Sequence, residues 1–219
     1  MIEHIGLKNE SKSIFWTFFL EYFNIWWVGI LKLGFLKCLK DEKIDPQEII
    51  EFPCLKICTK TFEVVSEFHY YVQPIHHSEL SNFCTELTGI TQDMVKDQPV
   101  FSEVFDLFQT WLSSENTENF ALVTCGDWDL NTCLEAQCQL SKIPFPKWAE
   151  SWINLKKSFQ KTMGYFPKGG FKTMVNQLGL EFLGRPHSGI DDTRNVAVVI
   201  KELAKNGHVF EFTSFRKQN

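Results

Sequence analysis

The sequence predicts an α/β domain, and three features carry this prediction. Residues 49–72 have the pattern of two strands joined by a turn. Phe120–Thr124 is a short apolar strand that leads into a helical segment, and a helical periodicity follows Ile190. The chain has 219 residues, of which 44% are hydrophobic. Because this is enough to bury one sizeable core, a single domain is the default expectation.

The first half of the domain is expected to form a hairpin followed by two helices. Ile49–Cys58 and Val64–Val72 are predicted to pair as strands. A helix is expected around Leu80–Leu87, with Gly89 as its stop. Pro99 then precedes a helix whose apolar stripe contains Val104, Phe105, Leu107, Phe108, Trp111 and Leu112.

The second half alternates strand and helix. Phe120–Thr124 is expected to be a buried strand, and the helix after it continues to about Leu140. A short helix closed by Gly179 contains Phe171, Met174, Val175 and Leu178. Alternation of apolar and polar residues predicts a last strand over His208–Thr213.

Residues 1–40 differ in character from residues 41–219. Ile14–Leu31 is a nearly continuous apolar run close to the lower length limit of a membrane span, and the lysines behind it favour a cytoplasmic C-terminal side. Glu21 and Asn24 argue against a span. The pattern leaves three interpretations open: a membrane-associated segment, a buried helix or strand, or a segment foreign to the ancestral domain.

Charge and cysteine content argue against three classes of protein. The formal net charge of −5 argues against a protein that coats nucleic acid without specificity. The seven cysteines are odd in number and include no Cys-x-x-Cys pair, so neither a disulfide framework nor a zinc site is indicated. Reduced thiols are typical of a cytoplasmic or nuclear protein, which is the expected location.

A local cluster of lysines stands out from this acidic background. One acid, Glu150, accompanies seven lysines between Ser141 and Met174. A solvated helix face is the common explanation of such a run, and a nucleic-acid-binding patch is the alternative. The lysines are Lys142, Lys147, Lys156, Lys157, Lys161, Lys168 and Lys172.

The segment from Gly184 to Asn195 has a spacing that suits catalysis. His187 precedes Asp192 by five residues, at the start of a helix whose apolar face runs from Val196 to Ala204. A carboxylate on a helix can hold a divalent cation, and a histidine on the loop before it can accept a proton from water. The pair therefore suggests metal-assisted hydrolysis. The alternative is that Asp191 or Asp192 caps the helix and that His187 is a surface loop residue.

A second carboxylate of interest follows the Phe120–Thr124 strand. Asp129 lies where this strand gives way to the next helix. Open α/β sheets bind their ligands at this place. The alternative is that Asp129 is an ordinary helix cap.

Several motifs together resemble a known family. The chain is similar to DEDDh-type 3′-to-5′ exonucleases of the RNase H-like fold, in the branch that trims histone mRNA and small RNAs. The resemblance covers roughly Asp41 to Thr213 and implies a mixed sheet flanked by helices. It rests on Glu48-Ile49-Ile50-Glu51-Phe52-Pro53, Phe83-Cys84-Thr85-Glu86-Leu87-Thr88-Gly89-Ile90, Asp127-Trp128-Asp129 and Arg185-Pro186-His187-Ser188-Gly189-Ile190-Asp191-Asp192.

The resemblance implies hydrolysis of the terminal phosphodiester of RNA, or less readily of single-stranded DNA, by two Mg²⁺ or Mn²⁺ ions held by four carboxylates. It implies that Asp129 and Asp192 are metal ligands and that His187 is the general base. Glu86, Leu87 and Thr88 match the stretch beside the terminal nucleotide, where Leu87 would wedge against the base and Thr88 would contact the sugar. The alternative for Leu87 is ordinary core. Arg185, Lys168 and Lys172 are expected to face the nucleic acid.

The first family motif, Asp-Phe-Glu-(Ala or Ser)-Thr-Cys, is missing. Anchoring the pattern on Cys38 puts Leu33 and Phe35 at its acidic positions, and anchoring it on Phe35 puts Gly34 and Leu36 there. Glu48 and Glu51 match a neighbouring strand and are not expected to face the metals. We therefore expect weakened metal binding and impaired exonuclease activity, with a catalytically silent RNA-binding or adaptor module as the alternative. The simplest account is that residues 1–40 come from an alternative exon or an imperfect gene model.

Overall fold

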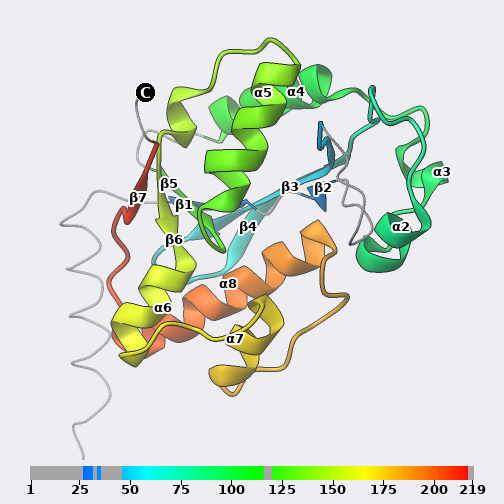
Figure 1. Cartoon of the computed structure of the whole chain (residues 1–219). Coiled ribbons are helices and arrows are strands. Elements are labelled where there is room, and N and C mark those ends of the chain that lie inside the picture. The colour runs from blue at the N-terminus through cyan, green and yellow to red at the C-terminus, as the bar shows by residue number, and fades with distance from the viewer. Residues whose placement is uncertain (1–26, 32–33, 36–45, 116–119, 217–219) are drawn as a thin grey trace, which may run out of the picture.

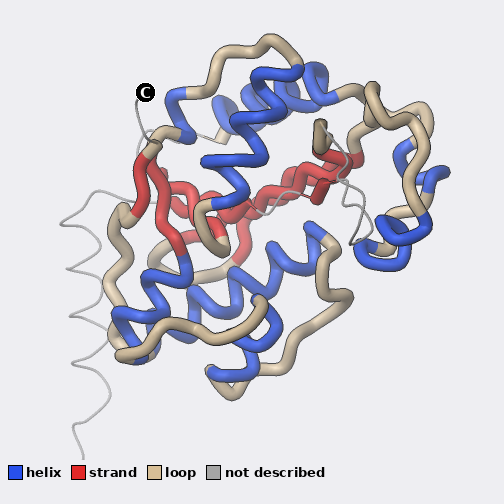
Figure 2. Tube along the Cα trace, in the orientation of Figure 1, coloured by secondary structure: helices blue, strands red, loops and turns tan. Residues whose placement is uncertain are grey.

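The computed structural model describes residues 27–31, 34–35, 46–115 and 120–216. These residues form one sheet with helices on both of its faces (Figures 1 and 2). The sheet has seven strands in the order β2-β3-β1-β5-β6-β7, and β4 pairs with β3. The strands are β1 Trp27–Leu31, β2 Gly34–Phe35, β3 Ile49–Cys58, β4 Val64–Tyr71, β5 Phe120–Thr124, β6 Ser151–Asn154 and β7 Ser214–Phe215.

The sheet is mixed. Strand β1 is parallel to β5 and β5 is parallel to β6, whereas the pairs β1–β3, β2–β3, β3–β4 and β6–β7 are antiparallel. Strand β4 occupies one edge of β3, and β1 and β2 follow one another along the other edge. The predicted α/β class and the mixed sheet flanked by helices are confirmed.

The helices divide between the two faces of the sheet. Helices α4 and α5 cover one face, and α6, α7 and α8 cover the other (Figure 1). The helices are α2 Asn82–Thr88, α3 Gln92–Val95, α4 Phe101–Ser114, the π-helix η1 Asp129–Leu134, α5 Glu135–Leu140, the 3₁₀-helix η2 Lys147–Ala149, α6 Leu155–Met163, α7 Phe171–Gln177 and α8 Gly189–Lys205.

Strand β3 contributes side chains to the hydrophobic clusters on both faces of the sheet, because successive side chains of a strand point to opposite faces. Phe52 and Cys54 pack in the cluster under α4 and α5, while Leu55 and Ile57 pack in the cluster under α6 to α8. The β3–β4 hairpin, the start and stop of α2, and strand β5 agree with the sequence predictions. Gly89 ends α2 with a left-handed φ of 82°, which a residue without Cβ adopts at little cost.

Two sequence predictions about the elements were wrong. Leu107 was placed in the apolar stripe of α4, but it is 41% exposed. The buried face of this helix is formed by other residues, including Val104 and Phe108, and Leu107 lies outside that face. His208–Thr213 was predicted to be a strand, whereas the last strand is β7 at Ser214–Phe215. The tail before β7 instead lies along α6, where Thr162 Oγ1 contacts His208 Nδ1 at 2.9 Å. Sequence analysis also missed β6 and α6.

The structure places the end of the apolar N-terminal run in the sheet. Trp27–Leu31 forms β1, which pairs with both β3 and β5, so part of residues 1–40 belongs to the folded domain. Residues 14–26 of the proposed membrane segment lie outside the described residues. Within the described ranges, no helix has the length and apolar character needed to cross a membrane.

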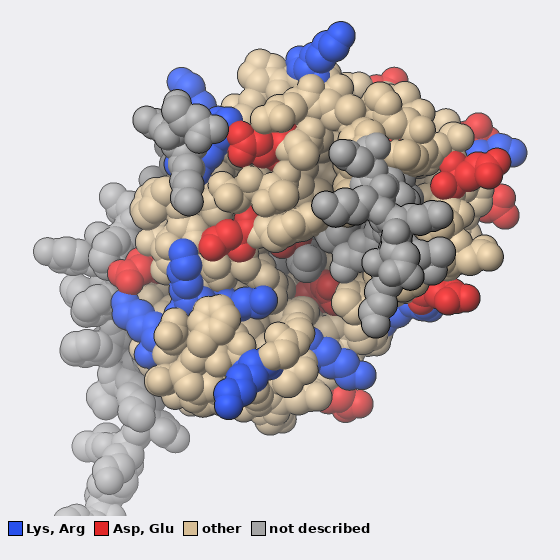
Figure 3. Space-filling model, in the orientation of Figure 1, with Lys and Arg blue, Asp and Glu red and all other residues tan. Residues whose placement is uncertain are grey.

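The lysine-rich run does not form one surface. Lys142 and Lys147 lie in the segment between α5 and β6, at the upper side of Figure 1, whereas α6 and α7 lie at the lower side. Basic side chains gather over α6 and α7 in the space-filling view (Figure 3). Lys168 and Lys172 are exposed in this lower group, and neither makes an ion pair with another described residue. We call Lys168 and Lys172 the α7 lysine pair.

The buried His208 is expected to make stability depend on pH. Burial is the main cause that lowers the pKa of His208 from 6.5 to about 4; Lys161 acts in the same direction and Glu211 opposes it. The unfolded chain then binds the proton more readily than the folded chain. Stability is therefore fully present above about pH 6.5 and falls as the pH drops toward 4.

We expect the free energy of unfolding in urea to decrease by roughly 1–2 kcal/mol from pH 7 to pH 5 on account of this group. His208→Gln should flatten this dependence, whereas the same change at the exposed His76 should leave it in place. Equal pH dependence in both variants would show that His208 is not its source.

Candidate active site

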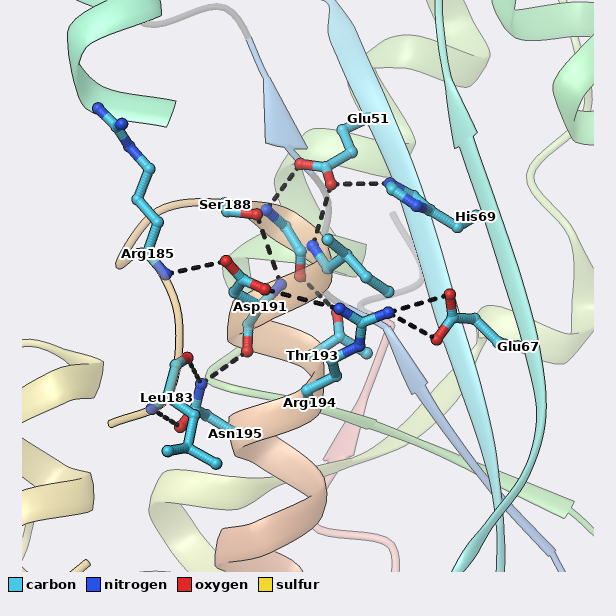
Figure 4. A network of polar contacts seen from close by, with 12 residues as sticks. Glu51, Glu67, His69, Leu183, Arg185, Ser188, Asp191, Thr193, Arg194 and Asn195 are labelled. Atoms are coloured by element: carbon cyan, nitrogen blue, oxygen red, sulfur yellow. Dashed lines mark hydrogen bonds and ion pairs between the residues drawn. The ribbon is translucent and has the colours of Figure 1, made fainter. Parts of the chain in front are cut away.

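The loop before α8 is held at Leu183 and Arg185 by side chains of that helix (Figure 4). The Asn195 amide donates to Leu183 O at 2.7 Å, and Leu183 N donates back to Asn195 Oδ1 at 2.9 Å. Arg185 N donates to Asp191 Oδ2 at 2.8 Å. These contacts hold the loop against the first turns of α8. The conformation of the segment that contains His187 is therefore set by the helix that follows it.

The two neighbouring aspartates of this motif have different surroundings. Asp191 is half-buried and serves the loop, through the bond from Arg185 N and a 3.7 Å contact with Arg194. Asp192 is 6% exposed, and its Oδ1 accepts a hydrogen bond from His187 N at 3.3 Å. The helix is capped by Ser188, whose hydroxyl accepts from Asp191 N. The interpretation of Asp191 or Asp192 as the cap is therefore wrong.

His187 lies on the loop, as predicted, and its side chain is exposed. Its φ of 73° is in the left-handed region, which non-glycine residues seldom adopt. Such strained residues cluster at functional sites, where surrounding contacts maintain them. The hydrogen bond from His187 N to Asp192 is one such contact.

Asp129 begins the π-helix η1, which follows β5 after the segment 125–128. It is 1% exposed, and the cap position belongs to Trp128, which makes no side-chain capping bond. The interpretation of Asp129 as an ordinary cap is therefore not supported. Single π-turns inserted at the start of an α-helix are frequent at functional sites.

Asp127 fastens the turn before Asp129, a role that the sequence analysis did not assign to it. Trp152 Nε1 donates to Asp127 Oδ1 at 3.0 Å, the Ser214 hydroxyl donates to the same oxygen, and Lys157 Nζ lies 3.8 Å from the other. Burial opposes ionisation of Asp127, but these hydrogen bonds and the lysine charge outweigh it and lower its pKa. Asp127 thus joins the turn before Asp129 to β6 and β7.

The topology brings these groups to one edge of the sheet. Strands β1 and β5 are parallel, so their carboxyl ends lie together, and Asp129 follows the end of β5. Strand β2 lies further along in the direction of β1, where Gly34 is opposite Glu51 of β3. The Glu51 carboxylate accepts hydrogen bonds from Gly189 N and Ile190 N, which places the start of α8 at the same edge (Figure 4).

Of the candidate positions for the first-motif acids, Gly34 and Phe35 lie in β2 at this edge. The strand segments β1 and β2 contain no acidic residue, and Leu33 and Leu36 lie outside the described residues. Within residues 27–31, 34–35, 46–115 and 120–216, no three His, Cys, Asp or Glu side chains form a group that could hold a metal ion. Asp129 and Asp192 are buried carboxylates of the right chemistry for a hard cation. Two such ligands do not fit a site that needs four to hold two ions, so we derive no hydrolytic step through metal.

Helix α2 carries the residues expected beside the substrate. Glu86 is exposed, and Leu87 is half-buried and therefore is not ordinary core. Thr88 is buried, and its hydroxyl donates to Cys84 O at 2.8 Å and accepts from Ile90 N at 3.1 Å. This hydroxyl already serves the end of the helix, which argues against the predicted contact with a sugar.

Arg185 joins α2 to the loop that precedes α8. Its guanidinium donates to the backbone oxygen of Glu86 and packs over Gly89, where an added Cβ would lie 2.9 Å from Arg185 Cδ. Arg185 is exposed but has this structural contact. The predicted substrate residues Glu86 and Arg185 are thus brought together by the fold.

Comparison with known proteins identifies the class to which this fold and these motifs belong. Residues 38–200 match the family model RNase_T, described as Exonuclease, and the chain belongs to this exonuclease family. The match begins beyond both candidate pairs of acidic positions. Members of the DEDDh group within this class depend on divalent metal ions.

Particular relatives are human exoribonucleases. The human protein named ERI1 exoribonuclease 3 is 46% identical over 189 residues, which cover 84% of this chain and 56% of the relative. Human 3'-5' exoribonuclease 1 is 38% identical over 168 residues, which cover 73% and 47% of the two chains. The chain spans about half the length of these curated relatives.

Solved structures confirm the predicted RNase H-like fold. The nuclease domain of 3'hExo, a DEDDh family member bound to rAMP, superimposes with a TM-score of 0.83 at 31% identity, covering 87% of this chain and 98% of that chain. A structure of 3′-end-specific recognition of the histone mRNA stem-loop by 3'-exonuclease gives a TM-score of 0.81 at 30% identity, covering 86% and 85%. The resemblance to a DEDDh exonuclease inferred from the motifs is therefore confirmed.

Proposed function

We propose that this chain binds the 3′ end of single-stranded RNA and hydrolyses it at a negligible rate. The observation that carries the proposal is the composition of β1 and β2. Strand β1 lies between β3 and β5, and β2 pairs with β3. The family pattern supplies its first two carboxylates in this region, and Trp27–Leu31 and Gly34–Phe35 contain no acidic residue. The scaffold is retained while half of the ligand set is lost.

RNA is the favoured ligand because the relatives are named exoribonucleases and one related structure concerns a histone mRNA stem-loop. Single-stranded DNA is the weaker candidate. The elements available for binding are the Glu86–Arg185 contact between α2 and the loop that precedes α8, and the α7 lysine pair. Asp129 and Asp192 could serve as ligands for Mg²⁺ or Mn²⁺, but the two acids of the first motif are absent. We therefore expect weak binding of either ion.

The test is a binding titration with 5′-labelled single-stranded RNA in the presence of Mg²⁺, Mn²⁺ or chelator. We expect the affinity to fall with salt and to be unaffected by chelator, and the RNA to keep its length. Rapid, chelator-sensitive shortening would contradict the proposal. The absence of RNA binding at low salt would contradict it as well.

Reversing the charge of the α7 lysine pair should weaken this binding. Lys168→Glu with Lys172→Glu is expected to lower the affinity and to flatten the dependence of log K on log salt by roughly 0.7 for each lost phosphate contact. Lys142→Glu with Lys147→Glu is the matched control, because it changes the same charge within the same run but at the opposite side of the molecule. Equal effects of the two pairs would show that net charge alone governs the affinity.

A further inference from the structure

A buried carboxylate of β3 lies at the start of α8. Glu51 is 1% exposed. Its Oε2 accepts from Gly189 N at 2.6 Å, its Oε1 accepts from Ile190 N at 3.0 Å, and His69 Nε2 of β4 lies 2.9 Å from Oε1 (Figure 4). The two backbone bonds join residues 138 and 139 positions apart.

These bonds satisfy groups that the helix itself cannot satisfy. The first N–H groups of an α-helix have no partner within the helix, and a negative charge is stabilised at this end. Ser188 serves the Asp191 N–H, and Glu51 serves the two N–H groups before it. The first turn of α8 is thereby attached to the sheet through one side chain.

Glu51 binds the chain between the two candidate site residues of the 184–195 segment. Gly189 and Ile190 lie between His187 and Asp192, which are themselves joined by the bond from His187 N to Asp192 Oδ1. A movement of this turn would displace both residues together. Asp129 is held independently on the turn after β5, through Asp127.

We infer that Glu51 is a positioning residue, which holds His187 and Asp192 in register with Asp129 at the edge of the sheet. The inference rests on the proposed function in so far as it treats these three residues as the retained half of an exonuclease site. Its local structural consequence, a first turn of α8 that depends on Glu51, can be measured without any activity.

The chain contains a matched control for Glu51. Glu48 is a second buried carboxylate on the way into β3, 2% exposed, and it also accepts backbone hydrogen bonds. Its partners are Ile75 N, His76 N and His77 N, at 2.7, 2.9 and 2.8 Å, in the segment after β4. Glu48→Gln thus makes the same chemical change at a comparable depth, away from α8.

The first experiment is hydrogen–deuterium exchange on the full chain carrying Glu51→Gln or Glu48→Gln, with the free energy of unfolding of each variant measured in urea. We expect Glu51→Gln to speed exchange in residues 187–192 by about tenfold more than any global loss of stability explains. Glu48→Gln should do so in residues 75–77 instead. Equal exchange of residues 187–192 in the two variants would overturn the inference.

The second experiment asks whether the positioning matters for chemistry, and uses the chain in which Leu33→Asp and Phe35→Glu return the first-motif acids. There Glu51→Gln should lower kcat by roughly 10–100-fold and leave KM for RNA nearly unchanged, because α2 and the lysines are untouched. Glu48→Gln at equal stability should leave kcat within about threefold.

The two experiments separate two kinds of failure. If Glu51→Gln and Glu48→Gln lower kcat equally, Glu51 contributes to stability and has no specific positioning role. If the chain with both acids returned binds no RNA and has no activity, the proposed function fails. The exchange experiment still decides whether Glu51 holds the turn.

Discussion

Replacing Leu33 by Asp together with Phe35 by Glu is expected to give this chain metal-dependent shortening of single-stranded RNA from its 3′ end. Asp129 and Asp192 are already present as buried carboxylates at the same edge of the sheet. Two further anionic ligands there would complete the set of four that the family uses. Loss of a group that only supports a metal ligand costs 10–100-fold, so returning two ligands should raise the rate by at least about 10²-fold over the unmodified chain.

The structure chooses between the two possible registers of this replacement. Gly34 lies opposite Glu51, and a Cβ added to Gly34 would lie 2.8 Å from Glu51 Cβ and 3.0 Å from Glu51 Oε2. A carboxylate at position 34 would therefore collide with a buried carboxylate. The register anchored on Cys38 leaves Gly34 unchanged and therefore does not introduce this collision.

The control is Gly34→Asp with Leu36→Glu, which adds the same charge in the other register. We expect this variant to be inactive and less stable in urea than the unmodified chain. Activity would be followed on 5′-labelled RNA with Mg²⁺, Mn²⁺ or chelator. If both registers gain activity, or if neither does, the placement of the missing acids is wrong.

Removing His187 from the chain with returned acids is expected to abolish the gain. His187 is the general base in the family scheme, and loss of such a group typically costs about 10²- to 10⁴-fold in rate. Its side chain is exposed, so its removal should change stability little. The φ of 73° makes asparagine the best replacement, because asparagine tolerates the left-handed region better than alanine does.

The measurement is kcat for His187→Asn beside the same substitution at the exposed His76. The family scheme requires a large loss for the first variant and none for the second, with KM for RNA similar in both. Retention of full activity by His187→Asn would assign the proton transfer to another group. It would also show that the left-handed conformation of residue 187 has no role in catalysis.

Some features of this protein follow from its sequence alone. The β3–β4 hairpin, strand β5 and helix α8 have local patterns of apolar residues that few other structures satisfy, and Gly89 marks a helix end because of its backbone freedom. His187, Asp129 and Asp192 were predicted as site residues because several multi-residue motifs occur together in a fixed order. The absence of acids from the first motif is likewise a property of the sequence.

Other features were decided only by the tertiary structure. A short apolar run such as Trp27–Leu31 is compatible with a helix or a strand, and its pairing with β3 and β5 makes this segment a strand. The lysine run appeared continuous, but the fold separates its first members from the α7 lysine pair. Glu51 matched a neighbouring strand in sequence, whereas its partners at the start of α8 are 138 and 139 residues away. Local periodicity specifies which face of an element is apolar, but long-range pairing specifies what that face meets.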